Sequence, residues 1–467
     1  MHEHLRFGGG VSESVLNPAV LILVLIAGVL ICILPRSRAV GAFLAAALLI
    51  PMDQVLLIGP AHFPMLRVLV LFGIVRILKD KLSSKLPLFS GGRNRLDLAL
   101  ILFTAFVALN GVLLFQESQE VINELGNLYT VFGVYFLLRF LIRDQEDVWA
   151  TIQTLAYVAA VVAVVMTYEQ ATGHNPYAVL GGARVANYAK LAVRDDRFRA
   201  QGPFSHSILA GTFGAVLIPL FVALWWRGRK YRKIAVLGVI SATVITLACN
   251  SSTPVLGYAA GVLALCLWPL RQWMRAVRWG IALTLVGLHL VMKAPVWHLI
   301  SRIDITGGSS SWHRFMLVDQ CIRHFGDWWL IGVKDTSVWG WDMWDTANQY
   351  VSICDNSGLL PFILFLAVLV YGFKYLGRGR RAAKDKQTAL FMWALGSALF
   401  ANTVAFFGIS YYDQTMVAWY ALLAMIPAAI SVLPKEEFIP PQPLETFPDE
   451  AKLAAQLAGQ PEYVDSL

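Results

Sequence analysis

The chain has 467 residues, of which 57% are hydrophobic and only 15% are charged, and its mean hydropathy is +0.60. Soluble domains carry about 25% charged residues, so this composition excludes a soluble globular protein and predicts an all-α, polytopic membrane bundle. The formal net charge is +8, but the Lys and Arg residues fall in short clusters between apolar runs. That pattern sets the orientation of membrane helices, and it argues against a nucleic-acid partner.

Apolar runs long enough to cross a bilayer recur along most of the chain. A spanning helix needs about 20 mostly apolar residues, and about thirteen segments qualify. The third is short and the fifth is interrupted by polar residues, so we expect about 12 or 13 helices. The candidates lie near 16–34, 40–58, 64–78, 96–115, 121–142, 149–168, 206–226, 234–249, 254–270, 279–294, 358–376, 387–408 and 414–433.

The basic residues indicate how these helices are oriented. Lys and Arg are concentrated in alternate loops, and cytoplasmic loops carry this excess in membrane proteins. The pattern predicts an N-terminus outside the membrane and a C-terminus in the cytoplasm. The intervening outer loops contain no Lys or Arg at 59–63, 116–120, 250–253 and 409–413.

The same features divide the chain into six parts. The first apolar segment is long and lacks a small-residue cleavage site, so we expect a spanning helix rather than a cleavable signal peptide. The last part is Pro-rich and acidic, which predicts a disordered cytoplasmic tail. The parts are N-terminal membrane helices, a first outer loop, central membrane helices, a large helical outer loop, C-terminal membrane helices and the tail, over 1–168, 169–205, 206–294, 295–357, 358–433 and 434–467.

Three arginines in the first outer loop break the charge pattern. Arg194, Arg197 and Arg199 lie on the expected outer face, just before the next membrane helix. Arginine binds phosphate oxygens with paired hydrogen bonds, and a helix N-terminus also favours an anion. We therefore regard Arg199 and Arg197 as candidates for binding an anionic substrate. The alternative is that these arginines pair with Asp195 and Asp196 or with lipid head groups.

The large outer loop carries a second set of polar candidates. The segment Trp312–Phe325 has helical apolar spacing and places His313 and Arg314 near its first turn. A carboxylate, an amide and a phenol then follow in close succession, a combination that can activate a sugar hydroxyl. The alternative for the charged residues is a solvated surface or a salt bridge. The candidates in that stretch are Asp345, Asn348 and Tyr350.

The five cysteines show no metal-binding spacing, so no metal site is expected. Cys32, Cys249 and Cys266 fall in or beside apolar spans, where a cysteine usually packs as a small apolar residue. Cys321 and Cys354 share the large outer loop. They can pair if that loop faces an oxidising compartment.

Several short motifs resemble those of the O-antigen ligase and O-antigen polymerase superfamily. Residues 199–211, RAQGPFSHSILAG, are similar to the family's motif of Arg-x-x-Gly followed by a helix. Arg314 follows a tryptophan and leads into an apolar helix, and DWWLIGV at 327–333 stands where the family has a Pro-x-x-Gly-x-Gly turn. ANQYV at 347–351 and NSGLLP at 356–361 resemble the family's His-Asn-x-Tyr-Leu stretch and the glycines after it.

The resemblance covers about 195–375 and implies a function. Members of this family work at the outer face of the bacterial cytoplasmic membrane, without a metal or another cofactor. They transfer a glycan from polyprenyl diphosphate to a sugar hydroxyl, and outer-face arginines bind the diphosphate. The resemblance therefore assigns diphosphate binding to Arg199 and Arg314.

One position departs from the family pattern. The family's catalytic histidine falls at Ala347, and alanine can neither accept nor donate a proton. We hypothesise that Asp345, His313 or His324 takes this role. The missing histidine also favours a polymerase over a ligase.

The leading interpretation is a glycosyltransferase that polymerises or transfers polyprenyl-diphosphate-linked oligosaccharides. Its expected partners are that lipid-linked substrate, an acceptor glycan and membrane lipids. Whether the protein also works beside a chain-length regulator is left open. A transporter or flippase of the same lipid-linked sugar is the competing class, with Asp53 as the candidate coupling-ion carboxylate. The third alternative is an inactive relative that serves as an assembly scaffold.

Overall fold

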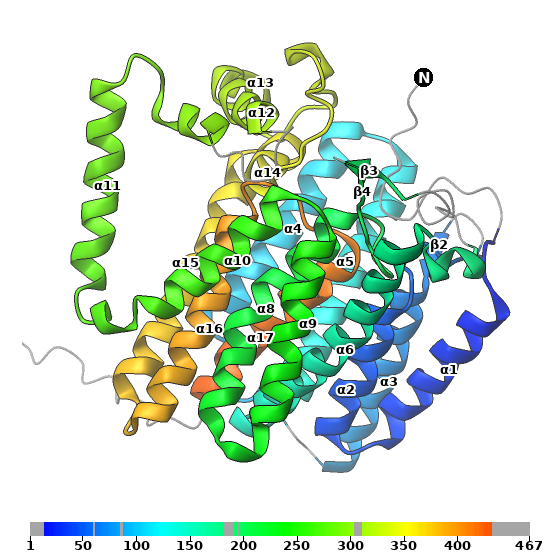
Figure 1. Cartoon of the computed structure of the whole chain (residues 1–467). Coiled ribbons are helices and arrows are strands. Elements are labelled where there is room, and N and C mark those ends of the chain that lie inside the picture. Colours follow the sequence, from blue (N-terminus) through cyan, green and yellow to red (C-terminus); the bar gives the residue numbers. More distant parts are fainter. Residues whose placement is uncertain are drawn as a thin grey trace, which may run out of the picture. The chain divides into compact units, whose positions relative to one another are not determined.

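The computed structural model describes residues 14–58, 61–84, 87–181, 191–194, 196–302 and 311–431. Within these ranges the chain folds into helices and two short antiparallel hairpins (Figure 1). The predicted tail at 434–467 and Asp195 lie outside the described residues.

The helices before the first outer loop are α1 (Pro18–Ile33), α2 (Arg36–Leu49), α3 (Met65–Ser84), α4 (Arg95–Phe115), α5 (Ser118–Leu141) and α6 (Gln145–Thr172). The later long helices are α8 (Ser207–Arg227), α9 (Arg232–Ala248), α10 (Ser252–Cys266), α11 (Met274–Val291), α15 (Leu359–Ala382), α16 (Lys386–Ala405) and α17 (Asp413–Ile430). The strands pair as β1 (Val55–Ile58) with β2 (Ala61–Pro64), and as β3 (Val193–Arg194) with β4 (Arg197–Phe198).

Nine of the described helices are long and apolar enough to cross a membrane. The protein is therefore a multi-pass, all-α membrane bundle. Fewer helices reach this length than we predicted, because α1, α2 and α10 have only 16, 14 and 15 residues and α3 is rich in charge. The nine are α4, α5, α6, α8, α9, α11, α15, α16 and α17.

The segment 40–58 shows the clearest departure from the predicted spans. Helix α2 ends at Leu49, and Val55–Ile58 forms strand β1 instead of continuing the helix. Ile50 is extended, with ψ of 129°, because Pro51 follows it and a proline disfavours helical geometry in the residue before it. The prediction of one continuous helix over this range is therefore wrong.

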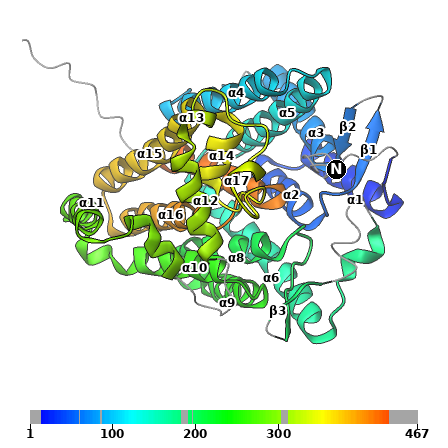
Figure 2. The ribbon, with the colours of Figure 1, turned by 90° about the horizontal axis from the view of Figure 1, so that it is seen from above.

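Helices α8 and α17 form the centre of the bundle. In each of them 89% of the apolar stretch is buried, and the view from above shows α17 surrounded by other helices (Figure 2). Helix α11 is the opposite case, since it buries none of its residues. It stands apart from the bundle in both ribbon views (Figures 1 and 2), so its apolar side chains are available to lipid tails.

Charges inside the bundle are paired with other groups of the protein. Arg139 and Asp97 are fully buried, with 3.0 Å between Nε and Oδ1. The hydroxyl of Tyr135 donates to the same carboxylate oxygen at 2.6 Å. Arg76 donates to the carbonyl oxygen of Leu34, just past the end of α1, at 2.7 Å. Such pairing is what makes a charge tolerable at membrane depth.

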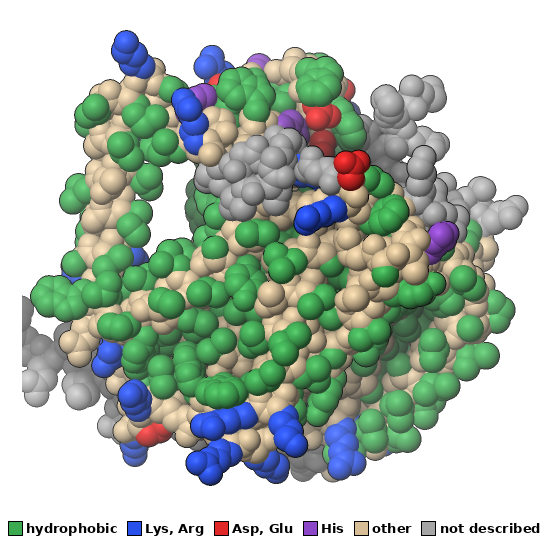
Figure 3. Space-filling view, viewed as in Figure 1, with side chains coloured by type: hydrophobic (Ala, Val, Ile, Leu, Met, Phe, Trp, Pro, Cys, Tyr) green, Lys and Arg blue, Asp and Glu red, His purple; other side chains and the backbone are tan. Residues whose placement is uncertain are grey.

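Basic side chains gather at one end of the bundle. Figure 3 shows Lys and Arg along the lower edge, below a broad band of hydrophobic side chains. The connection between α8 and α9 contributes Arg229, Lys230 and Arg232, and α15 contributes Arg380 and Arg381. The opposite end, which we call the α12 end, carries the segment between α11 and α15 (Figure 1).

This segment folds into a small helical layer over the bundle. All of its elements except η4 (Val296–Arg302) contribute to one apolar core. Asn110 of α4 connects the layer to the bundle by donating to the carbonyl oxygen of Ser357 at 2.5 Å. The contributing elements are α12 (Ser311–Arg323), α13 (Phe325–Trp328), η5 (Ser337–Trp339) and α14 (Gln349–Ser357). The core consists of Leu317, Cys321, Trp328, Trp339, Met343, Val351 and Cys354.

Replacing Gly358 with alanine should destabilise this layer by about 1–3 kcal/mol. Gly358 has a φ of +87°, and a Cβ there would lie 2.6 Å from the carbonyl oxygen of Leu330. The Tm of the detergent-solubilised variant measures the effect. Gly326→Ala is the matched control, because a Cβ at that position meets no atom within 4 Å. A Gly358→Ala protein as stable as Gly326→Ala would contradict the prediction.

Candidate functional site

The loop that carries Arg199 is held in place by two side chains of α6. Both carboxylate oxygens of Glu169 accept backbone N–H groups, from Gln201 at 2.6 Å and from Gly202 at 2.9 Å. The amide of Gln170 donates to the carbonyl oxygen at the end of α9, at 2.6 Å. The position of Arg199 is therefore set by the membrane helices rather than by the loop alone.

Arg199 is half-buried. Its Nε is buried and has no hydrogen-bond partner in the described part of the chain. Burial lowers the pKa of this guanidinium, and the thiol of Cys249 and the ring of His206 lie near it. Because burying a charge without a partner is costly, this arginine suits an anionic ligand.

The N-terminus of α10 lies at the same end of the bundle as Arg199, and Cys249 lies between them in the structure. The thiol of Cys249, next to the arginine, donates to the carbonyl oxygen of Thr246 at 3.0 Å and lies near the backbone N–H of Ser251. Ser251 is the N-cap residue of α10 and is 1% exposed, and its hydroxyl has no hydrogen-bond partner among the described residues. Free N–H groups and the helix dipole favour an anion at such an end. Together the cation, the hydroxyl and the helix end can bind a phosphate group.

His206 stands beside this site as a neutral ring. Its Nδ1 accepts the backbone N–H of Ile208 at 3.2 Å, so this nitrogen carries no proton. Burial, with a smaller contribution from the charge of Arg199, lowers the pKa of His206 to about 4. Near neutral pH the ring therefore holds its proton on Nε2 and can donate one hydrogen bond.

A second group of titratable residues lies in the helical layer. Arg314 is buried, with 9% of its surface exposed. Nε2 of His313 is 2.9 Å from the carbonyl oxygen of Asp342. A carbonyl only accepts hydrogen bonds, so Nε2 carries the proton and Nδ1 is left as the possible base. The structure thus places His313 and Arg314 beside the turn that contains both Asp342 and Asp345.

Asp345 belongs to the same group of residues. Partial desolvation raises its pKa, as does the neighbouring carboxylate of Asp342, while His313 and Arg314 act in the opposite direction. The side chain is exposed to solvent. It is accessible to a sugar hydroxyl that approaches from solvent.

The loop 406–412, between α16 and α17, joins the two groups of residues. Three successive carbonyl oxygens accept hydrogen bonds, from Gln349 to Phe406 (2.8 Å), from Asn348 to Phe407 (3.3 Å) and from Thr253 to Gly408 (3.3 Å). Just after the loop, Asp413 accepts a hydrogen bond from Ser205. Sequence reasoning missed this loop, because it contains no charged residue or motif that marks it.

The other predicted binding residues are placed differently. The side-chain oxygen of Asn348 caps α14 by accepting the N–H groups of Tyr350 and Val351 at 3.0 and 3.2 Å. The hydroxyl of Tyr350 donates to the carbonyl oxygen of Thr403 at 2.8 Å. Arg197 is exposed on β4. The polar groups of Asn348 and Tyr350 thus stabilise the fold around the site. Arg197, in contrast, is open to solvent.

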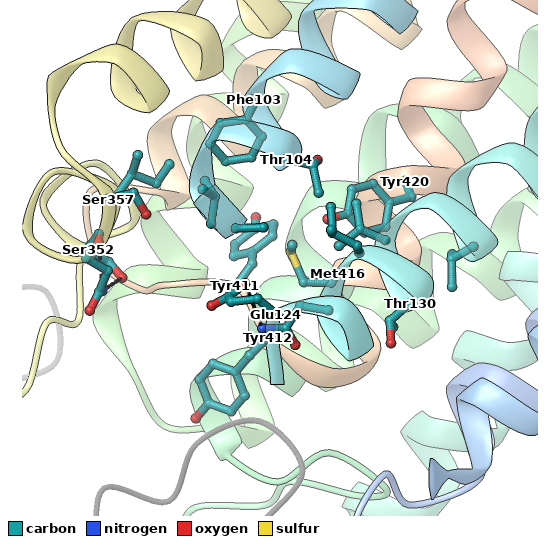
Figure 4. Close-up of a pocket in the computed structure, with 18 of the residues that line it drawn as sticks. Phe103, Thr104, Glu124, Thr130, Ser352, Ser357, Tyr411, Tyr412, Met416 and Tyr420 are labelled. Carbon is teal, nitrogen blue, oxygen red and sulfur yellow. Dashed lines mark hydrogen bonds between the residues drawn. The ribbon is translucent and has the colours of Figure 1, made fainter. Parts of the chain in front are cut away.

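A cavity of about 280 Å³ lies beneath the α12 end, between α4, α5, α14 and α17 (Figure 4). Its wall is mostly apolar and includes Phe103 of α4 and Met416 of α17. None of the predicted site residues is part of this wall. Glu124 of α5 and Tyr411 and Asp413 are part of it, so the cavity borders the same loop that joins the two groups of residues.

Backbone strain is concentrated around these loops. Five described residues other than glycine have a positive φ, and four of them border the site. Such conformations cost about 1–3 kcal/mol each and cluster at functional sites. The four are Asp196, Asn250, Asp342 and Asp413, with φ of 58°, 46°, 61° and 50°.

Comparison with known proteins does not add a relative. No protein-family model matches the chain, and no curated protein matches it either.

Proposed function

We propose that this protein is a membrane glycosyltransferase that acts on polyprenyl-diphosphate-linked oligosaccharides. The observation that carries the proposal is the half-buried Arg199, whose Nε has no hydrogen-bond partner among the described residues, beside the N-terminus of α10. A diphosphate is a strong acceptor for such a donor set. The resemblance of 199–211 and 347–361 to the O-antigen ligase and polymerase superfamily supports the same substrate class.

In the proposed reaction the acceptor hydroxyl oxygen bonds to the anomeric carbon of the lipid-linked sugar. The bond from that carbon to the diphosphate oxygen breaks, and its electron pair leaves with the diphosphate. Arg199 and Arg314 stabilise the charge that develops there. The hydroxyl proton passes to a base, for which Nδ1 of His313 and the carboxylate of Asp345 are the candidates.

The absence of the family's histidine is compatible with this mechanism. Ala347 lies in a tight turn, where its N–H bonds to the carbonyl oxygen of Asp345 at 3.0 Å. The carboxylate of Asp345, two residues before Ala347, can therefore act as a base in the region where the family's histidine would act. This supports a polymerase or a related transferase rather than the ligase mechanism unchanged.

The remaining features fit a lipid-linked substrate in the bacterial cytoplasmic membrane. The mostly apolar cavity below loop 406–412 suits the part of the polyprenyl chain next to the diphosphate. By the charge rule for membrane proteins, the basic end of the bundle, opposite α12, faces the cytoplasm. The site then lies on the outer face, where the lipid-linked oligosaccharide and the acceptor glycan meet.

Purified protein in liposomes with a polyprenyl-diphosphate oligosaccharide tests the proposal. Lengthened lipid-linked glycan is the result expected for a polymerase, and transfer to a separate acceptor without lengthening is expected for a ligase. The product is measured by glycan size and by release of polyprenyl diphosphate. Substrate that crosses the bilayer without forming a new bond would overturn the enzyme proposal in favour of a transporter.

A further inference from the structure

Two cysteines meet inside the apolar core of the helical layer. Cys321 of α12 and Cys354 of α14 are each 5% exposed, and both belong to the same core cluster. Helix α12 packs directly on α14, and the two thiols lie within hydrogen-bonding reach of each other. Both are present as thiols in the structure.

An acidic residue lies next to this pair. Asp355 is 2% exposed, and neither of its carboxyl oxygens has a hydrogen-bond partner among the described residues. Burial raises the pKa of Asp355 to about 7, and the neighbouring thiol of Cys321 limits the rise. The thiol of Cys321 is the polar group that faces this buried carboxyl group, so Asp355 is placed to take up the thiol proton.

We propose that Cys321 and Cys354 form a disulfide that links α12 to α14, and that Asp355 accepts the proton of Cys321 as it forms. The oxidant is a disulfide of the outer compartment, either of a protein or of a small thiol. The Cys321 thiolate attacks one of its sulfurs and releases the first thiol. The Cys354 thiolate then attacks the Cys321 sulfur and releases the second.

This exchange balances without any further reactant. The two electrons lost by the cysteines reduce the oxidant, and the two thiol protons end on its two sulfurs, the first by way of Asp355. Because both cysteines are buried, the oxidant reaches Cys321 when the layer opens enough to admit it, while Cys321 and Asp355 remain neighbours. The proposal does not rest on glycosyl transfer, and it requires only that the α12 end faces an oxidising compartment.

Differential alkylation of the full-length protein in membranes tests the bridge. Thiols are trapped with acid in whole cells and alkylated under denaturing conditions. The protein is then reduced and treated with a second reagent, and the labelled peptides are identified by mass spectrometry. Cys321 and Cys354 should take only the second label, and Cys32, Cys249 and Cys266 should take the first. First-round labelling of both Cys321 and Cys354 would overturn the proposal.

The role of Asp355 has a separate test. The reduced protein is reoxidised with oxidised glutathione at pH 7, and Asp355→Asn should form the bridge roughly 10²-fold more slowly. Asp335→Asn is the matched control, since Asp335 is exposed in the same segment and bonds to Ser337. An Asp355→Asn protein that reoxidises as fast as this control would overturn the assignment of Asp355.

Discussion

Replacing Arg199 with alanine should reduce glycan transfer by about 10²–10³-fold, the usual cost of removing one donor that stabilises developing charge. The loss should appear in kcat as well as in KM, because the charge on the diphosphate grows as the glycosidic bond breaks. Arg199→Lys should recover part of the activity, since lysine keeps the charge but lacks the paired donors of arginine. Initial rates with the lipid-linked substrate measure both variants.

A control from the same end of the bundle keeps this prediction specific. Arg323 is also basic, but its side chain is 67% exposed and pairs with Asp319 at 2.6 Å. Arg323→Ala should therefore transfer glycan at the wild-type rate. Equal activity in Arg199→Ala and wild type would show that the diphosphate binds elsewhere, and the proposed site would have to be abandoned.

Removing the base should reduce kcat by about 10²–10⁴-fold while substrate binding is retained. His313→Gln and Asp345→Asn distinguish the two candidates, because each change keeps the approximate size of the side chain and removes its ability to take up a proton. The variant with the larger loss identifies the base. Binding of the lipid-linked substrate, measured separately, should be close to that of wild type in both.

The control for this pair is His324→Gln. His324 is half-buried in the same layer, where it stacks on Trp339 and bonds to Asp327 at 3.0 Å. We expect this variant to keep its activity, although the sequence alone made His324 a candidate. Wild-type kcat in both His313→Gln and Asp345→Asn would exclude general-base catalysis by this cluster.

The membrane helices could be predicted closely because bilayer thickness dictates their length. Helix α4, predicted at 96–115, runs from Arg95 to Phe115. The failure at 40–58 has a local cause, since apolar composition is compatible with a strand as well as a helix. Pro51 ends the helix there, because it disfavours helical geometry at Ile50.

The site could be predicted only in part. Arg199 was found because a basic residue on the outer face breaks the charge pattern, but its missing partner and its place beside Ser251 depend on the packing of α6, α9 and α10. Asn348 and Tyr350 have the residue types of a sugar-binding site. Only their hydrogen bonds show that the fold itself uses these side chains.

Loop 406–412, which connects the two groups of site residues, has a consequence for mutagenesis. It holds the site together largely through carbonyl oxygens, and every amino acid supplies such an oxygen. Most side-chain replacements at Phe407 should therefore be silent, and a screen of point mutants would overlook the loop. Gly408 is the exception, because a Cβ there would lie 2.4 Å from the hydroxyl oxygen of Thr253. Deletions and changes in loop length are the alterations that would separate the two arginines and reveal what the loop does.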